Sequence, residues 1–342
     1  MTTPHFIAAA GLVKIFRVAD LEVVALQGLD IECERGEILA LVGPSGSGKS
    51  TLLNALGGLD RPSAGRLEVD GKNLLKLNQF ELTTYRREMI GFVWQQTARN
   101  LLPYLTAREN IELLMTLAGQ GGKQKRQWAD ELLDAVGMRE HANQRPTQLS
   151  GGQQQRIAIA CGLANRPQIL LGDEPTGEVD WPTAQMILKL LRDLRDRFGL
   201  TIVLVTHDPR VAAWADRTVA IRDGRTSTET MRVDDDQPQP MASGEAAPAE
   251  QPPTFEELVV LDSAGRLQIP SEQRVLAGIG RRAKVELVAG GILIRPSDDE
   301  RPTIPLNEPS AGPNHSSLYS SEPLPGSGEQ PPKRKLPWNH RT

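Results

Sequence analysis

The sequence lacks the features that would place the chain across a membrane or outside the cell. It has no run of about 18 apolar residues, the length that a membrane-spanning helix needs. The N-terminus, MTTPHFIAAAGLVKIF, has no positively charged stretch before its short apolar run, so it does not predict a secretory signal. From these absences we expect a chain that is cytosolic or peripheral to a membrane.

Cysteine is scarce and the charges nearly balance. The two cysteines, Cys33 and Cys161, lie in apolar surroundings without C-x-x-C spacing. This pattern predicts buried free thiols in a reducing compartment, not a disulfide framework or a zinc site. With 39 Lys and Arg against 43 Asp and Glu, the net charge is −4, so no overall basic surface points to nucleic acid.

Alternating strand and helix patterns fill residues 5–226 and predict an α/β domain. Short apolar runs at 38–43, 168–173 and 201–206 are typical of buried parallel strands. Residues of about 96–165 differ, because apolar positions recur there every three to four residues. That spacing predicts a helical subdomain inserted into the sheet domain.

The composition changes after residue 226. Residues 227–253 are acidic and rich in proline, so we expect a solvated linker. Residues 254–296 alternate like strands around one short helix, which predicts a small β-rich domain. Residues 297–342 are rich in proline, serine and glycine and predict a disordered tail, in which the basic PPKRK at 331–335 is a solvated segment.

The first motif with chemical meaning is GPSGSGKS at 43–50, which fits G-x-x-x-x-G-K-[ST] between an apolar strand and a helix. Its glycines let the backbone N–H groups face phosphate oxygens. Lys49 adds a positive charge for the β- and γ-phosphates, and the Ser50 hydroxyl can ligate Mg²⁺. The motif predicts a nucleoside triphosphate site. We expect nucleotide contacts from Gly43, Pro44, Ser45, Gly46, Ser47, Gly48, Lys49, Ser50 and Thr51.

Two carboxylates and a histidine follow two other buried strands. Asp173 and Glu174 lie near the end of QILLGDEP at 168–175, and His207 lies near the end of IVLVTHD at 202–208. In parallel sheets the carboxyl ends of strands face the ligand crevice. We therefore expect Asp173 to hold Mg²⁺, Glu174 to polarise the attacking water, and His207 to contact the γ-phosphate.

A second glycine-containing segment, LSGGQQQR at 149–156, precedes another apolar helical pattern. Glycines before a helix usually mean that the backbone approaches a phosphate closely. The chain already has a phosphate loop, so this second one needs an explanation.

Together these motifs resemble those of the ATP-binding-cassette (ABC) ATPases over about residues 6–226. The resemblance implies a P-loop fold with a RecA-like core, an antiparallel β-subdomain and a helical subdomain. It also implies ATP and Mg²⁺ as cofactors and ATP hydrolysis as the reaction. By the same resemblance Phe16 stacks on adenine, Gln95 contacts Mg²⁺ and the attacking water, Asp180 ends the D-loop GEVD at 177–180, and His207 is the switch histidine.

The resemblance also accounts for the second glycine segment. In this family two cassettes face each other head to tail, and LSGGQ of one chain closes over the ATP held by the other. The resemblance therefore implies a homodimer in which two chains share two ATP molecules. The N-terminus of the helix that follows would point at the γ-phosphate, where its dipole is favourable. The residues with this implied role are Ser150, Gly151, Gly152 and Gln153.

The run RREMIGFVWQQTARNLLPYLTARENIEL, followed by LSGGQQQRIAIA, is similar to the macrolide-exporter and lipoprotein-releasing subfamily. The likeness implies a separate membrane permease that docks near residues 96–110, at the inner face of the cell membrane, for export or force transmission. Arg99, Leu101, Leu102 and Tyr104 are the expected exposed contacts.

Four positions depart from the family pattern. Cys161 replaces a common arginine, Glu178 and Val179 replace small residues and leucine in the D-loop, and Gly172 replaces a common alanine. None of these removes an expected catalytic group. They bear on turnover and on coupling between subunits, whereas ATP binding is unaffected.

Residues 257–296 resemble the swapped-hairpin domain of AbrB-type regulators, on LDSAGRLQIPSEQRVLAGI followed by AKVELVAGGILIRP. A unit of this size buries too little to be stable alone, and the resemblance implies that it dimerises. Its basic and acidic residues nearly balance, so we expect it to hold two cassettes together and not to bind nucleic acid.

Two other functions are compatible with the motifs. A soluble ABC ATPase could act on ribosomes or DNA, although the translation factors of this type carry two cassettes and the DNA-repair type carries a long coiled coil, neither of which is present here. An ATP-linked regulator could bind DNA through the C-terminal domain. The transported cargo cannot be read from this chain.

Overall fold

The computed structural model describes residues 5–18, 21–96, 100–233, 254–261, 265–280 and 282–297. Most of the expected linker at 227–253, nearly all of the expected tail at 297–342 and Arg99 lie outside these residues. The chain divides between Leu276 and Ala277 into two units, which are described separately.

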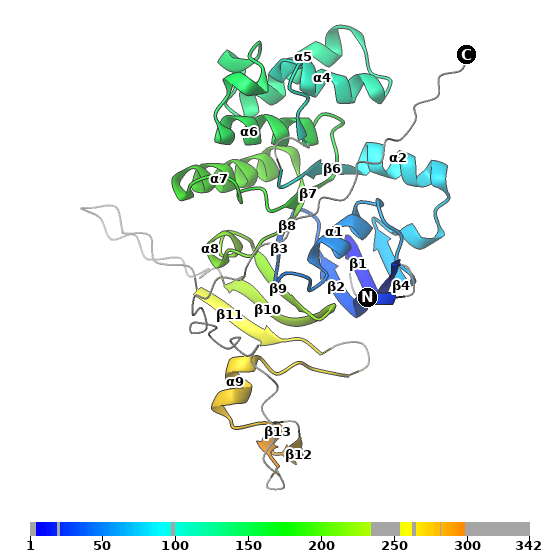
Figure 1. The fold of residues 1–342 in the computed structure, drawn as a ribbon, viewed down its shortest axis with the longest axis vertical. Coiled ribbons are helices and arrows are strands. Elements are labelled where there is room, and N and C mark those ends of the chain that lie inside the picture. The colour runs from blue at the N-terminus through cyan, green and yellow to red at the C-terminus, as the bar shows by residue number, and fades with distance from the viewer. Residues whose placement is uncertain are drawn as a thin grey trace, which may run out of the picture. The chain divides into compact units, whose positions relative to one another are not determined.

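A seven-stranded sheet with the order β11-β10-β9-β3-β8-β7-β6 forms the centre of the first unit (Figure 1). The neighbours from β9 to β6 are parallel, which brings their carboxyl ends to one edge. The strands expected at 38–43, 168–173 and 201–206 are confirmed, each buried over most of its length. The five parallel strands are β3 (Ile38–Val42), β6 (Ile90–Val93), β7 (Ile169–Asp173), β8 (Thr201–Val205) and β9 (Arg217–Arg222).

Both faces of the parallel strands are covered. Strand β3 is therefore apolar throughout, because its side chains are buried on both faces. Successive side chains of a strand point to opposite faces. Ile38 and Ala40 join the core that contains α6 (Gly151–Gly162) and α7 (Trp181–Phe198), on one side in Figure 1. Leu39 and Leu41 join a second core, which contains α1 (Lys49–Leu56) and the strands of the other large sheet.

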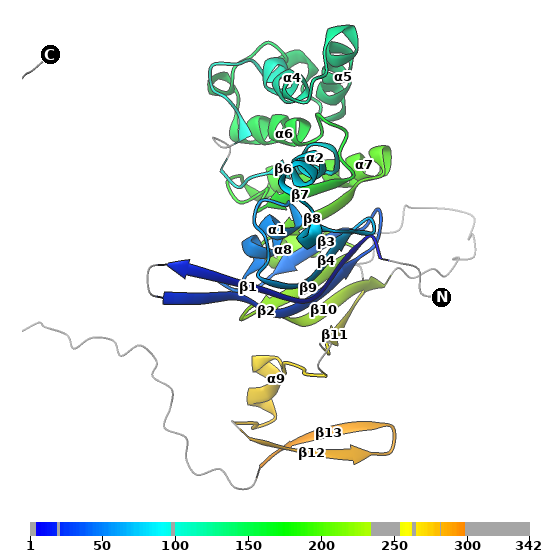
Figure 2. The same cartoon turned by 90° about the vertical axis from the view of Figure 1, so that its right-hand side faces the viewer.

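That second sheet is antiparallel, as expected, with the order β2-β1-β4-β5. Its long strands β1 and β2 run side by side as a hairpin (Figure 2). Alternate side chains of the sheet, including Leu12, Leu29 and Leu67, are fully buried against α1 and the central sheet. The strand bounds are β1 (Ile7–Val18), β2 (Leu21–Cys33), β4 (Ala64–Val69) and β5 (Lys72–Asn73).

Helices occupy the region where a helical subdomain was expected. Thr106 begins α4 with a capping box, because its hydroxyl accepts from Glu109 N and the Glu109 carboxylate accepts from Thr106 N. One face of α4 is buried against α5 and α6, with Ile111 and Met115 fully enclosed. The remaining helices are α2 (Gln79–Met89), α4 (Ala107–Leu117), α5 (Gly122–Ala135) and α8 (Pro209–Ala212), with 3₁₀ turns at Leu74–Lys76, Arg139–His141 and Pro146–Gln148.

Both cysteines are buried free thiols, as expected. Burial raises the pKa of Cys161 to about 12 and also raises that of Cys33. Both thiols are therefore protonated and unreactive at neutral pH.

The chain after residue 226 differs from the expectation in one respect. Strand β10 (Arg225–Val233) continues into the segment expected to be linker, and it pairs with β9 and with β11 (Thr254–Val259). The reason is that TSTET is polar but rich in threonine, a β-branched residue that suits a strand. Strand β11 and α9 (Ser271–Leu276) group with the first unit, and the second unit begins at Ala277.

In the second unit, β12 (Ala283–Val288) and β13 (Gly291–Pro296) form an antiparallel hairpin. Several of its apolar side chains are exposed, with Leu287 at 88% and Ile292 at 67%. A two-stranded hairpin of this kind is at best marginally stable in water. The hairpin therefore has apolar side chains that it does not bury itself.

Candidate nucleotide-binding and hydrolysis site

The loop at 43–50 leaves the carboxyl end of β3 and enters α1, with a backbone that only glycine permits at two positions. Gly43 has a φ of 145°, and a Cβ there would lie 2.1 Å from the backbone oxygen of Ile221. Gly48 has a φ of 103°, and its Cβ would lie 2.6 Å from the backbone oxygen of Ala25. The shape of the loop thus requires glycine at both positions.

Lys49 lies folded over this loop. Its Nζ donates hydrogen bonds of 2.8 Å to the carbonyl oxygens of both Gly43 and Pro44, and the residue is 8% exposed. Burial lowers the pKa of Lys49, and the nearby carboxylates of Glu174 and Asp173 oppose that shift. A partly desolvated ammonium group held at the mouth of such a loop favours an anionic ligand.

Ser47 gives independent support for a ligand in the loop. The residue is 3% exposed, and its Oγ is buried without a hydrogen-bond partner among the described residues. Buried hydroxyls are nearly always hydrogen-bonded in native proteins. A phosphate oxygen in the loop would supply the partner.

Ser50 and Asp173 bring two oxygen ligands together from α1 and the end of β7. The Ser50 hydroxyl donates to Asp173 Oδ1 at 3.3 Å. The described residues contain no cluster of three or more His, Cys, Asp or Glu that would hold a metal ion unaided. Mg²⁺ is usually held by one or two carboxylates together with substrate phosphates and water, so this small oxygen set fits it.

Glu174 lies at the centre of the candidate site. Its Oε1 is 2.8 Å from His207 Nδ1, and its Oε2 accepts from Gln95 Nε2 at 3.4 Å. These three residues follow β7, β8 and β6, so the parallel topology brings them together. Glu174 has a positive φ of 48°, which is uncommon for a residue other than glycine, and its backbone N–H donates to Val205 at 2.9 Å.

The second glycine segment forms the N-terminus of α6. Ser150 caps the helix by accepting from Gln153 N at 3.3 Å, while the Gln153 side chain accepts from Ser150 N at 2.8 Å. Gly152 packs against α7, since a Cβ there would lie 2.4 Å from Thr183 Cγ2. Gly151 has open space at its Cβ position.

The structure therefore joins some of the expected residues and leaves others apart. Hydrogen bonds connect Ser50 with Asp173, and Glu174 with Gln95 and His207. Ser150 and Gln153 bond to each other, and Gln153 Nε2 also lies 3.1 Å from His141. Phe16 is 37% exposed on β1, with Lys14 Nζ 4.7 Å from its ring centroid, and its stacking on adenine remains a prediction.

Asp180 ends the D-loop and caps α7, accepting from Thr183 N at 2.8 Å. The hydrogen bonds from Thr183 lower its pKa. The residue that follows, Trp181, was not singled out from the sequence. Trp181 lies under the guanidinium of Arg210, and both line a cavity of about 190 Å³ beside Glu174 and His207. Two residues so far apart in the chain leave no sequence signal of their contact.

One expected docking residue is placed differently. Leu101, expected to be exposed, is 4% exposed and belongs to the core with Ala107 and Ile111. Its apolar side chain points inward because the segment before α4 packs on the helical core. Leu102 is half-buried and Tyr104 is 65% exposed.

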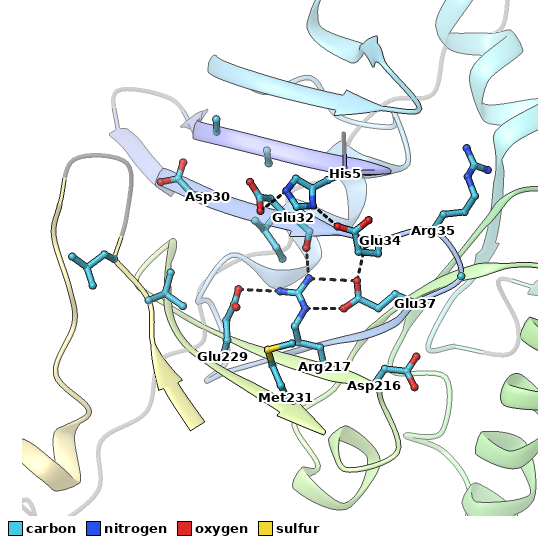
Figure 3. A pocket seen from close by; sticks show the side chains of 16 residues that line it. His5, Asp30, Glu32, Glu34, Arg35, Glu37, Asp216, Arg217, Glu229 and Met231 are labelled. Carbon is cyan, nitrogen blue, oxygen red and sulfur yellow. Dashed lines mark hydrogen bonds and ion pairs between the residues drawn. The ribbon is translucent and has the colours of Figure 1, made fainter. Parts of the chain in front are cut away.

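A larger hollow of about 920 Å³ lies away from these motifs (Figure 3). It is lined by residues of β1, β2, β9 and β10, by the turn before β3 and by the segment after β11. Arg217 donates to Glu37 at 2.7 Å, to Glu229 at 3.0 Å and to the carbonyl of Glu32. His5 pairs with Glu32 at 2.9 Å and with Glu34. Because these charges satisfy one another and no expected site residue lines the hollow, it is not the candidate site.

The fold and this geometry define a class: an α/β protein in which a glycine-rich loop, a Ser–Asp pair and a Glu–His pair meet at the carboxyl edge of the parallel strands. A profile of the ABC transporter family matches residues 26–177. An uncharacterised ABC transporter ATP-binding protein of Thermotoga maritima is 47% identical over 212 residues, which span 62% of this chain and 89% of that protein. The chain belongs to the ABC transporter family, in which it is an ATP-binding cassette of the ATPase class.

Two further matches refine this assignment. The macrolide export ATP-binding/permease protein MacB of Marinobacter nauticus is 44% identical over 230 residues, covering 67% of this chain and 35% of that protein. The chain thus aligns with about a third of the length of MacB. The dimeric post-hydrolysis structure of the cassette MJ0796, bound to ADP and Pi, matches with a TM-score of 0.60 and 40% identity, over 65% of this chain and 97% of that one. Among the described residues, no helix is long and apolar enough to cross a membrane.

Proposed function

We propose that this chain hydrolyses ATP as a head-to-tail dimer and thereby powers a separate membrane permease at the inner face of the cell membrane. The observation that carries the proposal is the meeting of Lys49, Asp173, Glu174 and His207 at one edge of the parallel strands. Two comparisons support it. MJ0796 cassettes are dimeric with ADP and Pi, and MacB is named as an ATP-binding and permease protein in one chain.

The residues divide the work of hydrolysis as follows. Lys49 and the backbone N–H groups of the loop orient the β- and γ-phosphates. Ser50 and Asp173 hold Mg²⁺, which neutralises phosphate charge when it is bound. Glu174 accepts the proton of the attacking water, and its contact with His207 fixes the carboxylate beside the γ-phosphate.

The second half of each site comes from the other copy. Gly151 has open space at its Cβ position, so a ligand can approach the N-terminus of α6 closely. Ser150 and the backbone N–H groups there supply donors and the positive end of the helix dipole. ATP held by one chain would be closed in by these groups of its partner.

Tyr104 marks the proposed permease contact. It is 65% exposed, just before α4, in the segment that follows Gln95. Movement of Gln95 on ATP binding would reach this surface through the short connection between them. Export and force transmission both fit this arrangement.

The second unit holds two copies together in the proposed dimer. Its exposed apolar side chains, including Leu287 and Ile292, need a cover. A second copy of the hairpin offers a surface of the same chemistry and closed symmetry. Deleting residues 277–342 should then weaken dimerisation without nucleotide, measured by sedimentation of both chains. Equal dimerisation of the full and the shortened chain would contradict this role.

The test of the proposed function is Glu174→Gln in the full chain. The amide keeps the size of the carboxylate and one acceptor oxygen but cannot accept the proton. We expect turnover to fall by at least about a hundredfold while ATP binding persists and a closed dimer accumulates. Glu88→Gln on the exposed face of α2 is the matched control and should keep full activity. Undiminished turnover in Glu174→Gln would refute the assigned chemistry.

A further inference from the structure

A closed ring of contacts joins the D-loop to the switch histidine within one chain. It begins where Asp180 ends the D-loop and Trp181 begins α7. The guanidinium carbon of Arg210, at the beginning of α8, lies 4.3 Å from the centroid of the Trp181 ring. A cation over an indole face is the favoured geometry for this kind of attraction.

Arg210 in turn fixes the loop that carries His207. Its Nη2 and Nε donate to Asp208 Oδ2 at 2.8 and 3.2 Å, and Nε also lies 3.1 Å from Oδ1. The backbone N–H of Arg210 donates to Asp208 Oδ1 at 2.9 Å, and Asp208 N donates to Thr206 Oγ1 at 3.1 Å. The hydrogen bonds from Arg210, first those of its side chain, lower the pKa of Asp208. The planar, forked guanidinium thus holds the residue next to His207 in one orientation.

The ring closes on Glu174 from both directions. On one side, His207 Nδ1 is 2.8 Å from Glu174 Oε1. On the other, Gly177 N donates to the Glu174 carbonyl at 3.0 Å, and a Cβ at Gly177 would lie 3.2 Å from Glu174 Oε2. The cavity of about 190 Å³ is lined by these same residues. A shift of the D-loop therefore has two short paths to the Glu174 carboxylate.

We propose that Trp181 and Arg210 are positioning residues that couple the D-loop to His207 and hold Glu174 in its productive orientation. This rests on the proposed function, because it assigns the coupling to the hydrolysis that Glu174 and His207 perform. The Arg210 side chain is 61% exposed, and exposed ion pairs contribute little to folding. Loss of the contact between Trp181 and Arg210 should consequently lower the rate of ATP turnover and leave the folding stability nearly unchanged.

The test compares Arg210→Gln and Trp181→Leu with their conservative counterparts, Arg210→Lys and Trp181→Phe, in the full chain. We expect kcat for ATP hydrolysis to fall about tenfold in Arg210→Gln and in Trp181→Leu, with KM changed less than about twofold. A misplaced Glu174 carboxylate affects the transition state more than it affects ATP binding. Trp181→Phe should retain most of kcat, because a phenyl ring still accepts a cation. Arg210→Gln combined with Trp181→Leu should be no slower than Arg210→Gln alone, because Trp181 acts through its contact with Arg210.

Arg166→Gln provides the matched control. Arg166 lies 3.9 Å over the ring of Trp128, an Arg–Trp pair that includes no residue of the site. Its loss should leave kcat unchanged. The melting temperature of each variant shows whether a loss of kcat comes from a misplaced side chain in a folded protein or from loss of folded protein.

Three outcomes would overturn the inference: an unchanged kcat in Arg210→Gln, multiplied effects in the double variant, or a loss of kcat that only follows a loss of folded protein. Glu174→Gln, measured beside them, separates this inference from the function it rests on. If Glu174→Gln is inactive and Arg210→Gln is fully active, only the coupling is wrong. If Glu174→Gln keeps full turnover, the proposed function itself is wrong.

Discussion

Two segments of this protein place glycines at the beginning of a helix, and they do so for different physical reasons. In the loop before α1, Gly43 and Gly48 have φ angles of 145° and 103°, which other residues rarely adopt. At the beginning of α6, Gly151 and Gly152 have no positive φ. The first segment needs glycine to take its shape.

The second segment needs glycine to leave room. Gly152 makes room for Thr183 of the same chain, whereas nothing of this chain lies within 4 Å of the Cβ position of Gly151. The phosphate loop is thus explained by its own chain. No contact within this chain explains Gly151, and the proposed dimer offers a reason for it, as ATP bound to the other copy.

The largest expected effect tests the first half of this comparison, which is the reason for glycine in the loop before α1. Gly43→Ala places a Cβ against the Ile221 carbonyl at a strained φ, which should cost about 2–3 kcal/mol of folding free energy and abolish ATP binding. Gly46→Ala is the matched control, because its φ is 79° but its Cβ position is open, so it should cost about 1 kcal/mol. Chemical denaturation and ATP titration measure both. Equal losses of folding free energy in the two variants would show that backbone strain alone, and not the close packing of the loop, makes Gly43 necessary.

A smaller effect tests the second half of the comparison, which is the reason for glycine at the beginning of α6. Gly152→Ala should lower the melting temperature, because its Cβ would meet Thr183 Cγ2 at 2.4 Å, and Thr183→Ala should restore it. Gly151→Ala should leave the melting temperature unchanged and still reduce ATP turnover. Thermal unfolding and ATPase assays on the three variants test this. The interpretation of Gly151 fails if both glycine variants behave alike.

The sequence was sufficient for the parts of the site that depend on local patterns. Apolar runs predicted β3, β7 and β8. Because parallel strands share one carboxyl edge, the residues at the carboxyl ends of these strands, such as Asp173 and His207, were expected to meet. The hydrogen bond between Ser50 and Asp173 and the contact between Glu174 and His207 agree with that expectation. Their roles in catalysis remain predictions.

The sequence could not predict features that depend on the direction of a side chain or on contacts between residues far apart in the chain. Leu101 reads as exposed in an irregular segment, because no periodicity shows which way its side chain points, and it is buried. Residues 227–233 read as linker because they are polar, but β10 finds partners on both sides that supply hydrogen bonds without an apolar pattern. Trp181 and Arg210 meet only through the packing of α7 beside the turn that begins α8.

The smallest expected effect concerns the cap of α7, next to the D-loop. Hydrogen bonds from Thr183 lower the pKa of Asp180, so the folded state favours the carboxylate. The stabilisation is present above the ordinary aspartate pKa of about 4 and is lost as the pH falls through the lowered value. Asp180→Asn keeps the acceptor without the charge. The difference in melting temperature between the two chains should therefore shrink on acidification below about pH 4, and a constant difference would contradict it.

The central claim, that each ATP site is shared between two chains, is tested most directly by mixing two inactive variants. Lys49→Ala removes the ammonium from the phosphate loop, and Gly151→Asp places a negative charge at the beginning of α6. A mixed dimer has one intact site, made of the loop of the second variant and the α6 N-terminus of the first. The account predicts that refolding the two variants together restores ATP hydrolysis that neither shows alone. A mixture as inactive as its components, with mixed dimers demonstrated by differential tags, would contradict it.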